Sequence, residues 1–266
     1  MFFNLRKLLD FFSYQPTPIP PAELQIFELL KDELKVIFDV GCRTDVSYYD
    51  LHPSGEYHLF EPNSSFVAEL KRKIALLPPN KISVNNFGLS DTNQDNCVYY
   101  ERSQSFLINP TIGGDVDTGK KFSIRKLDDY VDQHGIKKID FLKIDTEGFD
   151  YKVFQGGRKS LKKVRFLQFE YWDGVEKFYQ LLGLRYDLFL MMEPALLRAI
   201  QKIIWPKLTK AEQKLKFSNS LLPLTKTVQH LIDTKFIPAG CGGNILGISK
   251  QEKFDFRKLI FSISTP

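Results

Sequence analysis

The sequence predicts an α/β fold in which a mostly parallel sheet carries helices on both faces. Short apolar runs, at 36–41 and 139–144 among others, are typical of strands that are buried on both sides. Between these runs lie segments with apolar residues at helical spacing. Strands that alternate with helices of about ten to fifteen residues indicate a doubly wound parallel sheet.

Proline, asparagine and glycine mark several of the expected boundaries. Pro21 suits the first position of a helix, Asn63 can cap a second helix, and Gly135 can end a third. We expect helices at 21–34, 63–77, 126–134, 151–161 and 175–182, and strands at 36–41, 57–60, 81–86, 139–144, 165–169, 186–191 and 244–248. The segment 101–121 is rich in serine and glycine, and we interpret it as a long ligand-binding loop.

The ends of the chain differ from this alternating pattern. Residues 1–20 predict an N-terminal helix and a proline-rich linker, and 194–236 predict a lysine-rich helical insertion. The main domain then comprises 21–193 and 237–266. The N-terminal segment contains Arg6, Lys7 and Asp10 among its apolar residues, so we expect a helix that packs on the domain, with a membrane-surface helix as the alternative.

Composition and charge indicate an ordinary globular protein. Hydrophobic residues make up 43% of the 266 residues and charged residues 26%. The net charge of +5 is too small to indicate a nucleic acid partner, although it favours an anionic substrate. The three cysteines form no CxxC pair, which predicts neither a zinc site nor a disulfide framework and favours a cytoplasmic protein. No apolar run reaches the roughly 20 residues that cross a bilayer.

Acidic residues end four of the expected strands, at Asp39, Glu61, Asp145 and Glu170. Ligands of open parallel sheets bind outside the carboxyl ends of the strands. Gly41 follows Asp39 closely and lets the backbone approach a ligand. Glu61 lies about 20 residues further on, at the separation expected of an acid that binds ribose hydroxyls. These residues predict a nucleoside-containing cofactor.

The turn after the first strand distinguishes between two such cofactors. NAD requires a GxGxxG turn around its pyrophosphate, whereas this chain has one glycine, Gly41, and an additional acid, Asp45. S-adenosylmethionine has no phosphate and carries a positively charged sulfur, so nearby carboxylates favour it. The charges therefore favour S-adenosylmethionine, with an NAD-binding oxidoreductase as the alternative.

The sequence resembles the FkbM-type methyltransferase family. The segments that carry the resemblance are Phe38-Asp39-Val40-Gly41, Leu59-Phe60-Glu61-Pro62-Asn63, Phe87-Gly88-Leu89-Ser90-Asp91, Lys126 to Asp150 with its KIDTEG block, Val153 to Gly157, Phe169-Glu170 and Asn244-Ile245-Leu246. The resemblance implies the Rossmann-like fold of class I methyltransferases, S-adenosylmethionine as cofactor and methylation of hydroxyl oxygens on sugars or natural products. Arg43 and Asp45 stand where family members usually have asparagine and a second glycine.

The resemblance also implies roles for single residues. Asp39 and Gly41 would hold the methionine part of the cofactor and Glu61 its ribose. Phe87 and Gly88 would lie by the adenine, and Asp145 would lie near the sulfonium.

An alcohol is a weak nucleophile, so methyl transfer to it gains from a general base. Asp145 and Glu147 are our candidates because both lie in the turn after a central strand, with Glu170 as the reserve. Alternatively, Asp145 binds only the cofactor and Glu147 caps the following helix. We predict no metal site, although Asp145 and Glu170 could together face a magnesium or calcium ion.

The acceptor is the least specified part of the prediction. The expected acceptor is a small molecule or glycan. The basic residues of 194–236 form either a solvated face or a site for an anionic acceptor: Arg198, Lys202, Lys207, Lys210, Lys214 and Lys216. A catalytically silent nucleoside-binding protein of the same fold remains an alternative. The small net charge and the absence of an aromatic and basic stripe argue against an RNA methyltransferase.

Overall fold

A computed structural model describes residues 22–77, 81–102, 105–107, 116–172, 174–191, 205–210, 221–233 and 243–252 of the chain. The chain divides into two compact units. One unit is Lys31–Glu170, and the other joins the first 30 residues to the part from Tyr171 onward. The predicted boundaries at 20, 193 and 236 remain predictions.

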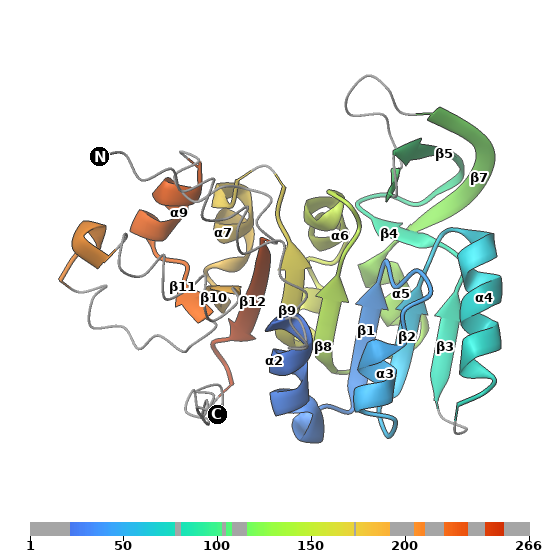
Figure 1. Cartoon of the computed structure of the whole chain (residues 1–266), viewed down its shortest axis with the longest axis horizontal. Helices are drawn as coiled ribbons and strands as arrows, with labels where there is room; N and C mark the ends of the chain where they lie inside the picture. Colours follow the sequence, from blue (N-terminus) through green and yellow to red (C-terminus); the bar gives the residue numbers. More distant parts are fainter. Residues whose placement is uncertain are drawn as a thin grey trace, which may run out of the picture. The chain divides into compact units, whose positions relative to one another are not determined.

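The unit Lys31–Glu170 contains the parallel strands that the sequence predicts. They are β1 (Val36–Val40), β2 (Glu56–Phe60), β3 (Ile82–Asn85), β8 (Ile139–Ile144) and β9 (Val164–Glu170), in the spatial order β9-β8-β1-β2-β3. All six residues of β8 are buried, as expected of a strand covered on both faces. In Figure 1 the arrowheads of β1, β8 and β9 point to the same edge, which places their carboxyl ends together.

Helices connect these strands. They are α3 (Ser47–Leu51), α4 (Ser64–Ile74), α5 (Leu127–Gln133) and α6 (Asp150–Gly156), with short 3₁₀ helices η1 (Lys31–Glu33) and η2 (Ser160–Lys163). The predicted cap of α4 is confirmed, since the Asn63 side chain accepts a hydrogen bond from the Ser65 amide at 3.0 Å.

The prediction of a single helix at 151–161 is wrong. The observed helix α6 ends at Gly156, and η2 follows as a separate turn. Gly156 lies against β4, where a Cβ would come within 1.9 Å of the Ser90 carbonyl oxygen. Beyond this contact Asp128 accepts hydrogen bonds from the amides of Lys159 and Ser160, which holds the chain in its new direction.

A second sheet replaces most of the loop expected at 101–121. Its strands are β4 (Gly88–Ser90), β5 (Gln94–Arg102), β6 (Ser105–Leu107) and β7 (Val116–Lys126), in the order β4-β7-β5-β6. β5 pairs antiparallel with both β6 and β7. Buried side chains of Cys97, Phe122 and Ile124 form its small core. The interpretation as a long loop was therefore wrong for the strands, while 103–104 and 108–115 lie outside the described residues.

The other unit contains α2 (Ala22–Leu30), α7 (Glu176–Leu182), β10 (Tyr186–Met191), η3 (Trp205–Lys207), β11 (Leu221–Pro223), α9 (Lys226–Asp233) and β12 (Asn244–Ser249). β10 pairs antiparallel with β11 and β12. The segment 194–236 thus includes a strand as well as the expected helical structure.

Several predicted features of this unit cannot be compared with the structure. Residues 1–20, and Arg198, Lys202, Lys214 and Lys216 of the basic run, lie outside the described residues. Among the helices that are described, none combines the length and apolar character needed to span a bilayer.

Candidate active site

The carboxyl edge of the parallel strands brings the predicted acids together. Val40 lies in register with Phe60 of β2 and Ile144 of β8, and Ile144 lies in register with Phe169 of β9. The residues that follow these four positions are Gly41, Glu61, Asp145 and Glu170. Backbone hydrogen bonds extend the pairing by one step, from the Gly41 amide to the Phe60 carbonyl and from the Asp145 amide to the Val40 carbonyl, both at 2.9 Å.

Gly41 is the point of closest approach between two of these strand ends. Its φ of +80° is in the left-handed region, and a Cβ there would lie 1.9 Å from the carbonyl oxygen of Asp145. Only glycine meets both requirements. The glycine expected to admit a ligand therefore also lets the turns after β1 and β8 pack together.

Glu61 is buried and joins the loops after β1 and β2. Its Oε2 accepts a hydrogen bond from the Arg43 amide at 3.0 Å, and its Oε1 accepts one from the Asn63 amide at 2.7 Å. Burial raises the pKa of Glu61, against the lowering effect of these amides. Each carboxylate oxygen has a second lone pair, so the group can still accept hydrogen bonds from a ligand.

The turn after β1 keeps its shape without the second glycine. Arg43 has a φ of +51°, in the left-handed region that asparagine tolerates better than most residues. The φ of Asp45 is not positive, so glycine is not required there. Asp45 instead accepts hydrogen bonds from the amide and hydroxyl of Ser47, at 2.9 and 2.6 Å, at the start of α3.

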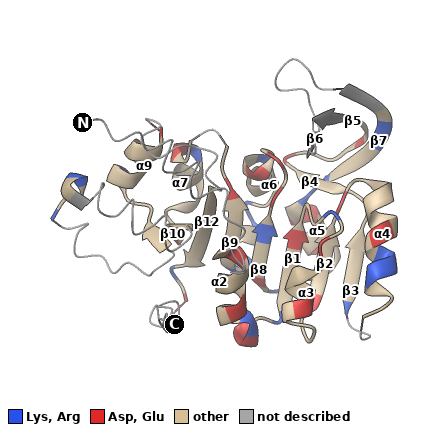
Figure 2. Ribbon diagram, viewed as in Figure 1, with Lys and Arg blue, Asp and Glu red and all other residues tan. Residues whose placement is uncertain are grey.

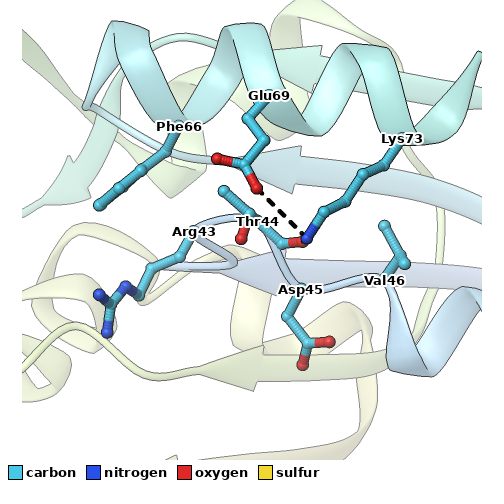
Figure 3. A pocket seen from close by; sticks show the side chains of 7 residues that line it. All are labelled: Arg43, Thr44, Asp45, Val46, Phe66, Glu69 and Lys73. Atoms are coloured by element: carbon cyan, nitrogen blue, oxygen red, sulfur yellow. Dashed lines mark hydrogen bonds and ion pairs between the residues drawn. The ribbon is translucent and has the colours of Figure 1, made fainter.

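This turn and α4 enclose a pocket of about 410 Å³ (Figure 3). Its lining residues are Arg43, Thr44, Asp45, Val46, Phe66, Glu69 and Lys73. Glu69 and Lys73 form an ion pair along α4, and Lys73 donates to the Thr44 carbonyl at 2.8 Å. The Arg43 guanidinium lies 5.3 Å from the centre of the Phe66 ring. In Figure 3 the charged ends of Arg43 and Asp45 point away from the Glu69–Lys73 pair.

Lys143 connects the acids at the ends of β1 and β8. Its Nζ lies 3.0 Å from Oδ1 of Asp39 and 3.6 Å from Oδ2 of Asp145. In Figure 2 a basic position in β8 lies beside an acidic position in β1. The side chains of Asp39 and Lys143 are 4% and 10% exposed, whereas that of Asp145 is 47% exposed. Asp39 therefore faces Lys143, and Asp145 faces outward.

The sequence interpretation missed Lys143 as a site residue. Burial, together with the charges of Asp45 and Asp145, raises the pKa of Asp39 against the lowering effect of Lys143. Burial alone would lower the pKa of Lys143, but Asp39 and Asp145 raise it well above its usual value. A lysine flanked by apolar residues in a buried strand was a usable signal, because buried lysines are rare unless they are paired.

Asp150 is a second missed residue, and it ties the turn after β8 to the end of β9. Its Oδ2 accepts hydrogen bonds from the amide and hydroxyl of Thr146, at 3.2 and 2.7 Å. Its Oδ1 accepts from the Glu170 amide at 2.9 Å. Burial raises the pKa of Asp150 to about 6, against the lowering effect of these hydrogen bonds. The two turns with the candidate bases are thus held by one buried carboxylate.

Glu147 and Glu170 are both half-buried. Glu147 has a φ of +53° and precedes Gly148 in the tight turn after β8. Helix α6 begins at Asp150 with Phe149 at its N-cap position, so Glu147 lies before the residue that occupies the cap.

Phe87 and Gly88 lie next to the end of β2. The Phe87 ring centre is 5.8 Å from that of Phe60, in an edge-on arrangement. Gly88 is buried, and a Cβ there would meet Ile124 at 3.5 Å and Pro62 at 3.7 Å, which are ordinary contacts. The structure therefore places both residues near Glu61 without a steric need for the glycine.

The described residues contain no cluster of typical metal ligands. Among the described residues, no group of three or more histidine, cysteine, aspartate or glutamate side chains could hold a metal ion.

Comparisons with known proteins identify the family of the chain. The sequence model of a protein family, the methyltransferase FkbM domain, matches residues 39–183, more than half of the chain. The 2-O-methyltransferase NoeI of Sinorhizobium fredii is 24% identical over 177 residues, which cover 60% of this chain and 72% of that protein.

Two solved structures are similar at a lower level. The methyltransferase FkbM of Methylobacillus flagellatus is 15% identical with a TM-score of 0.42, and the match covers 60% of this chain but only 40% of that protein. A putative rRNA-methylase of Clostridium thermocellum is 10% identical with a TM-score of 0.43, over 88% and 97% of the two chains. At these scores the solved structures add no argument to the family match.

Proposed function

Because the chain belongs to the FkbM methyltransferase family, we propose that it transfers a methyl group from S-adenosylmethionine to a hydroxyl oxygen of a sugar, glycan or small metabolite. The protein is an S-adenosylmethionine-dependent methyltransferase with the Rossmann-like fold of class I methyltransferases. The choice of an oxygen acceptor is supported by the relative named as a 2-O-methyltransferase.

The residues at the carboxyl edge suit this cofactor. When bound, S-adenosylmethionine supplies a methyl group on a positively charged sulfur. Four acids, Asp39, Glu61, Asp145 and Glu170, lie at or next to the strand ends, where carboxylates favour a cationic ligand. In this proposal Glu61 holds the ribose hydroxyls with its remaining lone pairs, and Phe87 and Gly88 lie by the adenine. Gly41 lies by the methionine part and Asp145 near the sulfonium, while Asp39, expected to hold the methionine part with Gly41, is buried against Lys143.

The half-exposed carboxylate of Asp145 is the observation that carries the proposed chemistry. It is the acid at this edge that combines a central position with access to solvent, whereas Asp39 and Glu61 are buried. A base that removes the proton of the acceptor hydroxyl as its oxygen attacks typically contributes about 10²–10⁴-fold in rate. Asp145 is our first candidate for this base and Glu147, in the same turn, our second. Glu170 remains the reserve.

The proposed acceptor is anionic, in keeping with the net charge of +5. Lys207 and Lys210 are the described members of the basic run in 194–236, and both are exposed. Phosphate-bearing and neutral forms of the same sugar would separate an anionic acceptor from a neutral one.

The test measures turnover and cofactor affinity separately. Turnover is measured as formation of S-adenosylhomocysteine with a panel of sugars, and cofactor affinity is measured by calorimetry. The variants compared are Asp145→Asn, Glu147→Gln and Glu170→Gln. We expect the variant of the base to lose about 10²-fold or more in turnover and to keep its affinity for the uncharged product S-adenosylhomocysteine. Asp132→Asn, an exposed acid at the end of α5, is the matched control.

Two results would contradict the proposal. Absence of binding to both S-adenosylmethionine and S-adenosylhomocysteine would remove the cofactor assignment. Tight binding without methylation of any hydroxyl acceptor would leave a nucleoside-binding protein of the same fold.

A further inference from the structure

The charges around Lys143 divide into a buried part and an exposed part. The ammonium of Lys143 lies within ion-pair distance of two carboxylates, so the three groups carry a net charge of −1. Asp39 and Lys143 are both nearly inaccessible, and Asp145 is half-exposed. The buried pair compensates itself, which leaves the uncompensated charge on the acid that faces outward.

We infer that the buried Asp39–Lys143 ion pair sets the preference of the donor site for the cationic donor over its neutral demethylated product. The inference rests on the proposed function. Asp39 acts through Lys143 and not by touching the ligand. Without Asp39, the Lys143 ammonium would cancel the charge of Asp145, and the site would lose its attraction for a sulfonium.

The groups around the pair leave Lys143 as the main source of positive charge. Tyr57 of β2, Glu61 after β2, and Cys42 and Asp45 after β1 interact electrostatically with Asp39. From α3, the Tyr48 ring centre lies 6.0 Å from Nζ of Lys143. Arg43 donates its backbone amide to Oε2 of Glu61, and its guanidinium lies 5.3 Å from the centre of the Phe66 ring.

Such a preference has a kinetic consequence for a methyltransferase. The donor carries one more positive charge than S-adenosylhomocysteine, and the two are otherwise nearly identical in shape. A site with one net negative charge holds the donor more tightly and releases the product more readily. A neutral site would bind both alike and be inhibited by its own product.

The test is the ratio of the dissociation constants of S-adenosylhomocysteine and S-adenosylmethionine, measured by calorimetry at pH 7.5. Asp39→Asn keeps the size of the side chain and removes its charge, and we expect the ratio to fall by about three- to tenfold. Asp39→Asn with Lys143→Met removes both charges and should return the ratio to within about twofold of the wild type. Lys138→Met, just before β8 and paired with Asp140 at the opposite edge, is the matched control.

The outcomes distinguish the inference from the proposed function. If Asp39→Asn weakens both ligands equally, the pair is only structural and the inference is overturned. A ratio that also falls in the double variant overturns it as well, and this second criterion applies even if the single variant does not fold. If the wild type binds neither ligand, the proposed function itself fails.

Discussion

The two edges of the parallel sheet each contain a buried aspartate, and the two carboxylates differ in the number of donors around them. Asp140 of β8 at the amino edge and Asp39 of β1 at the carboxyl edge are both 3% exposed. Asp140 is surrounded by four donors at 3.0–3.1 Å: the amides of Lys35 and Val36, the Arg165 guanidinium and the Lys138 ammonium. Among the described residues Asp39 has a single such donor, the Lys143 ammonium at 3.0 Å from its Oδ1.

The pKa values of the two acids follow this difference. Burial would raise the pKa of Asp140, but the surrounding donors together lower it. Burial raises the pKa of Asp39 in spite of Lys143. The Asp140 carboxylate at the amino edge thus holds strands together. The Asp39 carboxylate at the carboxyl edge has fewer donors and lies at the edge where ligands of parallel sheets bind.

The largest expected effect is the loss of stability when a glycine is replaced, and this loss should differ between the two edges. Gly41→Ala should destabilise the protein by about 3 kcal/mol or more, because its Cβ would overlap the Asp145 carbonyl in a left-handed conformation. Gly135, before β8, also has positive φ, but a Cβ there meets nothing within 4 Å, so Gly135→Ala should cost about 1 kcal/mol. Urea unfolding measures both, and equal costs would contradict the role of the close approach.

A smaller effect is expected from removing the acids themselves. Asp140→Asn removes the nearer of the two carboxylates beside the half-buried Arg165 guanidinium, the other being that of Glu33, and should cost about 2–3 kcal/mol of unfolding free energy. Asp39→Asn should cost less, about 1–2 kcal/mol, because Lys143 keeps Asp145 as a partner and a charge that burial disfavours is removed. If Asp39→Asn is the more costly of the two in chemical denaturation, the contrast between the edges is wrong.

The smallest expected effect is a pH dependence at the carboxyl edge. Burial raises the pKa of Asp150 from 3.8 to about 6, so the folded state binds more protons than the unfolded state between these values. The contribution of Asp150 to stability therefore decreases as the pH rises through this window. The destabilisation by Asp150→Asn should be about 1–2 kcal/mol larger at pH 4 than at pH 7. Unfolding curves at four pH values test this, and a penalty independent of pH would refute it.

Much of the central sheet could be predicted from the sequence because burial on both faces leaves a strong apolar signal. β1, β2, β8 and β10 lie within one residue of the expected ranges. The second sheet gave a weaker signal, since β5 and β7 carry many polar residues and bury only a small core around Cys97, Phe122 and Ile124. The serines and glycines of the segment 101–121 are equally typical of a loop.

The candidate site was predictable where a residue type follows a strand end. Asp39, Glu61 and Asp145 could be found in this way because parallel strands align their carboxyl ends. Lys143 carried a signal as a lysine in a buried strand, but its role and that of Asp150 depend on partners from other strands. The partnership of Lys143 with Asp39 follows from the register of β8 on β1, which pairs these two residues directly. That register is a property of packing and not of local sequence.

The contact of Arg43 with Glu61 fixes the shape of the turn after β1 without using the side chain of residue 43. Only the main chain of residue 43 takes part in that contact, and its guanidinium lies over Phe66 instead. Any amino acid that accepts this backbone conformation can preserve the loop while changing what surrounds the neighbouring acid. Position 43 is therefore a place where relatives can diversify their ligand environment without rebuilding the scaffold beneath it.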